Sequence, residues 1–287
     1  MTEIALSAGP VDYEDTGGDG PPVVLLHGLL MDGSLWAGVV PDLVAAGHRC
    51  VVPTLPMGAH RHPVAAGADL SLPGLAALVS ELLDRLDLRD VTLVGNDTGG
   101  AVAQLVVAGG APRVGRVVLA GCEAFDNLPP GLTGRTIALL GKLPPRLFGL
   151  FMQQMRLKPV RRLPIAFGWL TRRGDGATRR WMRPILTDAA IRRDTVRMLR
   201  AVFADRDVLS AAAAPGGGLA AFDRPALVVW ARGDRVMPPD HGRRLAALLP
   251  QGRLVVVDDS RTLVALDQPA VLAALVADFV PAGRSVA

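Results

Sequence analysis

Short apolar runs recur along this chain, and each is bounded by glycine, proline or charged residues. Runs of this length without polar alternation are typical of strands that are buried on both faces. One more run, at 10–16, alternates and predicts an edge strand. The continuous runs predict buried strands at 22–26, 48–53, 91–95, 114–120, 225–230 and 253–257.

Segments with helical periodicity lie between these runs. Ser71 precedes one of them as a predicted N-cap, with Pro73 in the first turn. Repeated strand–helix units predict an α/β fold, a doubly wound and mostly parallel sheet. The predicted core helices cover 34–46, 71–87, 98–109, 239–249 and 268–280.

The strand–helix alternation stops between residues 127 and 222. Amphipathic pieces, broken by proline and glycine, predict helices at 135–141, 146–155, 177–186 and 188–203. A small-residue, glycine-rich stretch at 211–218 predicts a linker. We therefore predict one core formed by 1–124 and 221–287, with a helical cap inserted at 125–220.

Several polar residues directly follow predicted strands: His27, Asp97, Glu123 and Asp234. In open parallel sheets, ligands bind beyond the carboxyl ends of the strands. This placement predicts an active site at that edge of the sheet, with the helical insertion over it as a lid.

The stretch 94–100 reads Val-Gly-Asn-Asp-Thr-Gly-Gly, between an apolar strand and a helical run. Glycines at this spacing allow a strained strand-to-helix turn that presents the central side chain. A serine nucleophile usually occupies that position, and here it is Asp97. The alternative is that Asp97 simply caps the following helix.

These features together resemble the α/β-hydrolase superfamily, over nearly the whole chain. The resemblance rests on His27-Gly28, the elbow at 95–100, the stretch Trp230 to Asp234, and Asp267-Gln268-Pro269 before the last helix. Because an aspartate occupies the elbow, the chain most resembles the branch that holds haloalkane dehalogenases and epoxide hydrolases.

The resemblance implies roles for individual residues. Asp97 matches a nucleophile that forms a covalent ester, and the backbone N–H groups of Leu29 and Thr98 match an oxyanion hole. Gly28 matches a position where the backbone approaches closely, and His27 a structural residue behind the site. In the family an acid orients the catalytic histidine. Asp234 matches the commoner position of that acid, and Glu123 matches the alternative one.

The pattern fails at the catalytic histidine, because Thr262 occupies the matching position and no histidine follows His241. A threonine hydroxyl is not a base near neutral pH. The tryptophan that dehalogenases carry after the nucleophile is Thr98 here, and the single tyrosine, Tyr13, lies far from the predicted cap. Neither specific reaction is supported in its usual form.

Other side chains remain as candidates around the site. His60 and His62, on a loop at the correct edge of the sheet, are candidates to supply a base, with exposed loop histidines as the alternative. Trp169 and Trp181 are candidates to line the pocket, with core packing as the alternative. No metal-ligand spacing or phosphate loop is present, so we expect no metal and no cofactor.

Charge is unevenly distributed: residues 131–206 carry 17 Lys/Arg and four acids, whereas the remainder carries 14 and 23. A basic segment of this kind either attracts an anionic substrate or surface, or is a solvated helical face. Nucleic acid is not expected, because no stacking aromatic series accompanies the cations.

No apolar stretch is long enough to predict a membrane span, and the N-terminus reads as no signal peptide. Cys50 and Cys122 lie in apolar runs and are expected to be buried free thiols, which indicates a cytoplasmic location. The oligomeric state stays open.

We therefore expect a hydrolase acting on a small, mostly apolar molecule, with Asp97 as nucleophile or base. A lyase, isomerase or cyclase on the same scaffold is the first alternative, because the residue that normally activates water is missing. An inactive binding relative is the second.

Overall fold

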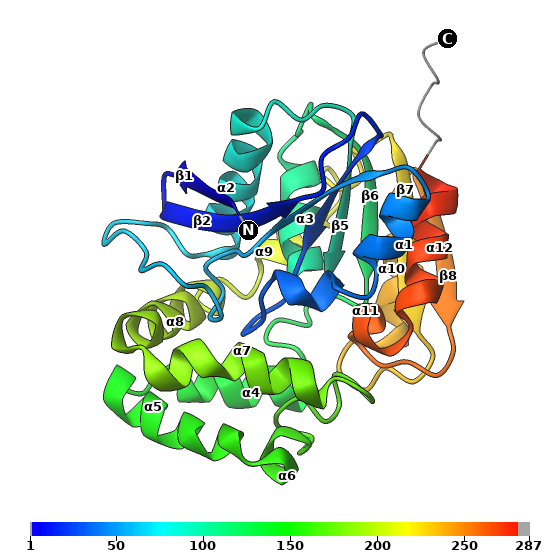
Figure 1. Ribbon diagram of the computed structural model, residues 1–287. Coiled ribbons are helices and arrows are strands. Elements are labelled where there is room, and N and C mark those ends of the chain that lie inside the picture. Colours follow the sequence, from blue (N-terminus) through cyan, green and yellow to red (C-terminus); the bar gives the residue numbers. More distant parts are fainter. Residues whose placement is uncertain (1, 281–287) are drawn as a thin grey trace.

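The computed structural model describes residues 2–280 as an eight-stranded sheet between two layers of helices, with further helices at one end (Figure 1). The strand order is β1-β2-β4-β3-β5-β6-β7-β8. β1 pairs antiparallel with β2, and β2 pairs antiparallel with β4. The remaining neighbours, from β4 through β3, β5, β6 and β7 to β8, pair in parallel. The strands are β1 (Thr2–Leu6), β2 (Gly9–Asp15), β3 (Pro22–Leu26), β4 (Arg49–Pro53), β5 (Val91–Asn96), β6 (Val114–Ala120), β7 (Pro225–Ala231) and β8 (Gln251–Val257).

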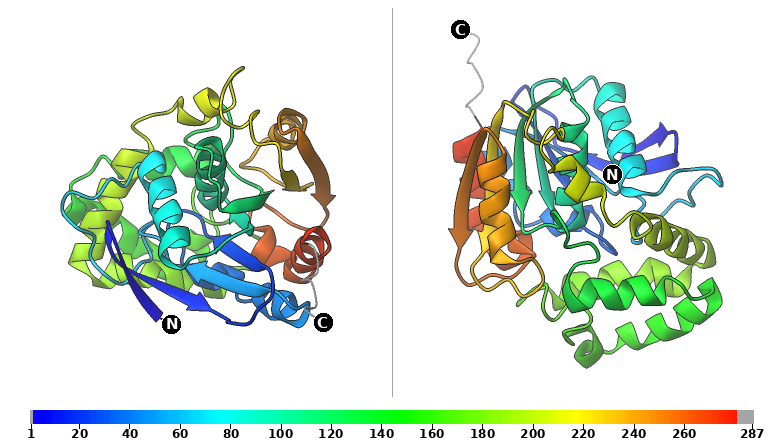
Figure 2. Two further views of the ribbon diagram at one scale, coloured as in Figure 1. Left: turned by 90° about the horizontal axis from the view of Figure 1, so that it is seen from above. Right: turned by 180° about the vertical axis from the view of Figure 1, so that it is seen from behind.

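Helices cover both faces of this sheet (Figure 2). α1 and α12 pack together on one face, and α2, α3 and α10 lie on the other. The predicted doubly wound, mostly parallel α/β sheet is confirmed. The core helices are α1 (Val40–Ala45), α2 (Leu72–Arg85), α3 (Thr98–Ala108), α10 (Pro239–Leu248), α11 (Val264–Asp267) and α12 (Pro269–Phe279).

Helices between β6 and β7 form a layer beyond the carboxyl ends of the parallel strands (Figure 1). Apolar side chains of this layer, Phe148 and Trp181 among them, belong to the same buried cluster as the sheet. The boundaries of a separate cap at 125 and 220 stay a prediction. The helices of this layer are α4 (Gly131–Leu140), α5 (Pro145–Met152), α6 (Lys158–Arg161), α7 (Asp175–Thr187) and α8 (Ala189–Val202), whereas the short α9 (Val208–Ala212) packs against α3.

Some local predictions were wrong in detail. The edge of the sheet is β1, which the sequence pattern did not reveal, so the strand predicted at 10–16 lies one position inside. The helix predicted over 34–46 is a 3-10 turn (Gly33–Trp36) followed by the short α1. Pro41 lies in the first turn of α1, a position that suits proline. In the interior of one helix over 34–46 the same proline would break the helix.

Other local predictions are confirmed. The Ser71 hydroxyl accepts a hydrogen bond from the Gly74 N–H at 3.1 Å, as a helix N-cap does. Cys50 and Cys122 are buried and free. Among the described helices, none is both long enough and apolar enough to cross a membrane.

Candidate active site

Asp97 lies at the tip of a tight turn between β5 and α3, with φ 56° and ψ −135°. This left-handed conformation is strained for a residue with a side chain. Gly99 makes the turn possible, because a Cβ there would lie 2.2 Å from the Leu26 carbonyl oxygen. Asp97 makes no capping hydrogen bond to α3, so the turn presents a carboxyl group that the helix does not use.

The loop after β3 approaches the Asp97 carboxyl closely. A Cβ on Gly28 would lie 2.2 Å from Asp97 Oδ2, so only glycine fits at this position. The backbone N–H groups of Thr98 and Leu29 face the Asp97 carboxyl and lower its pKa. The two N–H groups expected to form an oxyanion hole therefore face the carboxyl itself.

Burial has the opposite effect on the pKa of Asp97. Asp97 is only 5% exposed, and desolvation raises its pKa well above the ordinary value of 3.8. The neighbouring Glu123 is the next largest cause of the rise. Two buried carboxyl groups that repel each other in this way disfavour the state in which both are ionised.

Glu123 follows β6 and is fully buried. The Thr98 hydroxyl donates to Glu123 Oε1 at 2.7 Å, while Glu123 Oε2 has no hydrogen-bond partner. Desolvation raises the pKa of Glu123 from 4.5 to about 7. Gln104 of α3 donates to the Glu123 carbonyl at 2.7 Å and fixes its backbone.

A pocket of about 250 Å³ opens beside these two acids. Asp97 and Glu123 are its only titratable lining residues within the described part of the chain. Helices α4 to α6 and the segment that follows supply most of its wall. The wall is largely apolar and includes Ile137, Met152, Met155, Phe167, Leu170 and Val236.

Asp234, the other predicted acid, does not line this pocket. Its Oδ1 accepts from the Thr262 hydroxyl at 2.8 Å and from the Val236 and Met237 N–H groups, both at 2.9 Å. Burial raises its pKa from 3.8 to about 6. Thr262, which occupies the place expected for a histidine, is fully buried and pairs with Asp234.

The histidines lie elsewhere. His27 Nδ1 bonds to the Gly28 carbonyl and Nε2 accepts from the Leu55 N–H, both at 2.9 Å, and burial lowers its pKa to about 4. A neutral, fully bonded His27 agrees with a structural residue. His60 is buried, with Nε2 3.9 Å from Asp194 of α8, and is not among the pocket residues.

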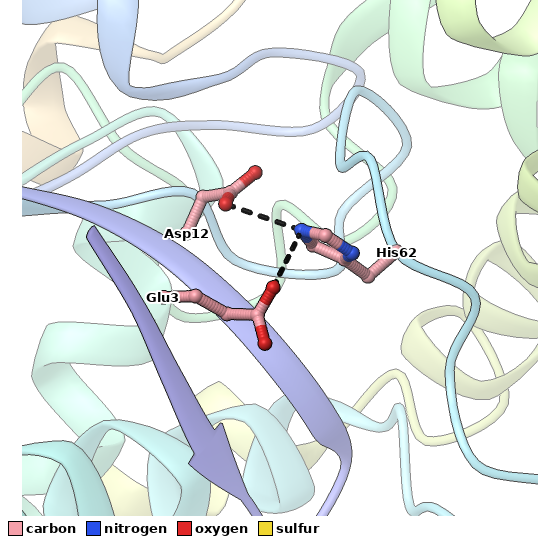
Figure 3. Close-up of side chains that lie close together, drawn as sticks. All are labelled: Glu3, Asp12 and His62. Carbon is pink, nitrogen blue, oxygen red and sulfur yellow. Dashed lines mark hydrogen bonds and ion pairs between the residues drawn. The ribbon is translucent and has the colours of Figure 1, made fainter. Parts of the chain in front are cut away.

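His62, on the loop after β4, lies against the β1–β2 hairpin and is not among the pocket residues (Figure 3). Its Nε2 is 3.2 Å from Asp12 and 3.4 Å from Glu3. Within residues 2–280 this trio is the one group whose spacing suits a metal ion, with ligand atoms within 4.8 Å of one another. The Arg61 Nε, 3.9 Å from Asp12, already places a positive charge there.

The tryptophans are not pocket residues either. Trp181 is fully buried, and its Nε1 donates to Asp32 and Ser34, each at 3.0 Å. Trp169 packs half-buried against the core. The pocket walls instead come from residues that sequence reasoning did not single out, such as Met152 and Met155. Their only signal was the apolar periodicity of the insertion.

Comparison with known proteins agrees with this fold. The family model described as alpha/beta hydrolase fold matches residues 21–269. The 2-hydroxy-6-oxononadienedioate/2-hydroxy-6-oxononatrienedioate hydrolase of Cupriavidus pinatubonensis is 30% identical, over 85% of this chain and 81% of its own. A haloalkane dehalogenase of Psychrobacter cryohalolentis is 36% identical over 37% of this chain and 36% of its own.

Among solved structures, a meta-cleavage product hydrolase from Pseudomonas fluorescens superposes with a TM-score of 0.72 at 19% identity, over 97% of both chains. The fold, the strained elbow and these matches define one class: the chain belongs to the alpha/beta hydrolase fold family. Within that class it is an alpha/beta hydrolase whose elbow carries an aspartate.

Proposed function

We propose that this enzyme hydrolyses a small, mostly apolar and uncharged molecule by means of a carboxyl pair, Asp97 and Glu123. One observation carries the proposal: these two acids are the only titratable side chains among the described residues of a largely apolar pocket. A pair of this kind supplies both a base and an acid to one bound molecule.

The chemistry follows from the protonation of the two acids. Burial and mutual repulsion favour ionisation of at most one of them near neutral pH, so one carboxyl stays protonated. The ionised member removes a proton from a water molecule as the water oxygen bonds to the substrate. The bond to the leaving group then breaks, and the protonated member gives its proton to that group. The raised pKa of Asp97 favours proton transfer over attack by its carboxylate on carbon, since a protonated carboxyl is a poor nucleophile.

The charge of the pocket limits the substrate. The Cupriavidus pinatubonensis relative is named as a hydrolase of dioates, which carry two carboxylates. No Lys, Arg or His is among the described pocket residues, so nothing there offsets such charges, whereas Asp97 and Glu123 repel them. This comparison supports a neutral substrate.

A non-hydrolytic reaction is the second candidate. It is favoured by the position of Thr262, which replaces the expected histidine and bonds to Asp234 outside the pocket. A base and an acid on an apolar molecule also suffice for an isomerase, lyase or cyclase, none of which needs to activate water.

The first experiment compares Asp97→Asn, Glu123→Gln and Asp234→Asn with the wild type on a panel of neutral esters, ketones and epoxides. Loss of either pocket acid is expected to lower kcat/KM by roughly 10²- to 10⁴-fold, the usual contribution of a general acid or base. Asp234→Asn serves as the matched control, since Asp234 also follows a strand end and has a pKa raised by burial, but it does not line the pocket.

Reaction in ¹⁸O-labelled water separates the two candidates, because hydrolysis places one labelled oxygen in the product and isomerisation places none. Full activity of Asp97→Asn, or an equal loss in all three variants, would contradict the role of the carboxyl pair.

A further inference from the structure

Exposed apolar side chains are concentrated in one short part of the chain. Of the eleven large hydrophobic side chains that are exposed within residues 2–280, eight lie between 132 and 165, on α4, α5 and the segment around α6. Leu139, Leu150 and Leu157 are 65%, 66% and 60% exposed. We call these eight side chains the apolar cap face.

The periodicity on α5 shows that this exposure belongs to one side of the helix. Leu147, Leu150 and Phe151 are exposed, whereas Phe148 and Met152 are buried against the rest of the molecule. Spacings of three and four residues place the exposed set on one face. α5 therefore carries a second apolar face for which the chain itself supplies no partner among the described residues.

The segment that carries the apolar cap face is positively charged. Residues 127–174 contain no Asp or Glu, and six Lys or Arg side chains between 135 and 162 are exposed. Among them, Arg156 and Lys158 flank Leu157 directly. An apolar surface whose own segment carries cations and no acids matches the boundary of an anionic lipid layer, where apolar groups enter the acyl region and cations meet the headgroups.

The pocket opens through the same surface. Phe151 and Ile165 are 49% and 44% exposed, and both also line the pocket beside Asp97. α5 and α6 form the outer edge of the helical layer, on the side away from the sheet (Figure 1). A flat surface that meets this edge therefore lies next to the mouth of the pocket.

We propose that the apolar cap face docks the enzyme on an anionic lipid surface, without any segment crossing the bilayer. The entry of an apolar substrate from that lipid into the pocket rests on the function proposed above, but docking itself does not.

Flotation with vesicles of phosphatidylcholine alone, or with added phosphatidylglycerol, tests the docking on the full chain. We expect the wild type to float with the anionic vesicles and to remain behind with the neutral ones. Raising the salt from about 0.1 M to about 1 M should release it, because the Debye length falls from about 10 Å to about 3 Å.

The key variant is Leu150→Glu/Leu157→Glu, which changes two exposed residues outside the pocket. We expect at least a tenfold lower partition onto anionic vesicles. The matched control is Val44→Glu/Val271→Glu, at two residues that are each 43% exposed on the core helices α1 and α12, and it should float as the wild type does.

Asp97→Asn should also float, which separates a failure of docking from a failure of the proposed chemistry. Three results would overturn the docking: no flotation of the wild type, equal flotation of both double variants, or a wild-type dimer that Leu150→Glu/Leu157→Glu converts to a monomer without any vesicle binding. The last result would assign the surface to a second copy of the chain.

Discussion

Thr98 and Thr262 each donate a hydrogen bond to a buried acid, and the two acids end in different surroundings. Thr98 holds one oxygen of Glu123 and leaves the other unpaired at the pocket. Thr262 and two backbone N–H groups all bond to Oδ1 of Asp234, whose Oδ2 is also unpaired, but Asp234 does not line the pocket. At the scale of single residues, these two hydroxyls favour Glu123 over Asp234 as the partner of Asp97.

The raised pKa of Glu123 has a consequence for stability. Its pKa rises from 4.5 to about 7 on folding, so folding favours the protonated form. The stabilisation is complete below about pH 4.5 and is lost as the pH rises through about 7. Asp234, raised to about 6, acts in the same direction.

Glu123→Gln should therefore remove part of this pH dependence. A shift of this size corresponds to a free energy on the order of 3 kcal/mol, so the variant should gain stability relative to the wild type between about pH 5 and about pH 8. Urea unfolding of both proteins across that range measures the gain. A difference between them that does not change with pH would contradict the assignment.

At the scale of elements, Asp267 fastens the helical layer to the end of the core. This carboxylate is 3% exposed. It accepts from the Thr171 hydroxyl at 2.7 Å, the Arg172 N–H at 2.9 Å and the Arg261 N–H at 3.0 Å. It thereby connects the segment before α7 to the loop before α11.

Asp267→Ala should lower the free energy of unfolding by roughly 3 kcal/mol or more, because several buried donors lose their acceptor together. Asp259→Ala is the matched control: Asp259 pairs with Arg172 and Arg173 of the same segment, but on the exposed surface. Thermal and urea unfolding compare them. Equal destabilisation by both variants would show that burial of Asp267 is not what matters.

The local elements followed from the sequence where a short-range rule decided them. The strands at β3 and β6, the Ser71 cap and the glycine of the elbow depend on neighbours in the chain. β1 did not follow from the sequence, because most of its side chains are exposed and buried and exposed positions do not alternate clearly along it.

The site was predictable only in part. The strand ends brought Asp97 and Glu123 to one edge, as expected, since parallel strands share that edge. The Thr98 hydroxyl on Glu123 and the pairing of Thr262 with Asp234 join residues 25 and 28 positions apart, and no local pattern encodes them. The same holds for His60, whose place against α8 depends on how the helical layer docks.

At the scale of the whole molecule, the helical layer and the sheet share one hydrophobic core. Phe148, Trp181 and Met198 of that layer pack in the same cluster as Trp230 of β7. We expect a single cooperative unfolding transition, because neither part can separate without exposing this core. Urea curves followed by tryptophan fluorescence and by far-UV circular dichroism should coincide. An earlier fluorescence change, with most helicity retained, would instead indicate that the layers unfold separately.

The pair of acids in the pocket also makes ligand binding a protonation reaction. A neutral ligand that displaces water beside Asp97 and Glu123 makes their ionisation harder still, so binding draws protons from the buffer at pH values near 7. A cationic ligand has the opposite effect and releases protons. The heat of binding in a calorimeter will therefore depend on the ionisation enthalpy of the chosen buffer, and the slope of that dependence counts the protons that move.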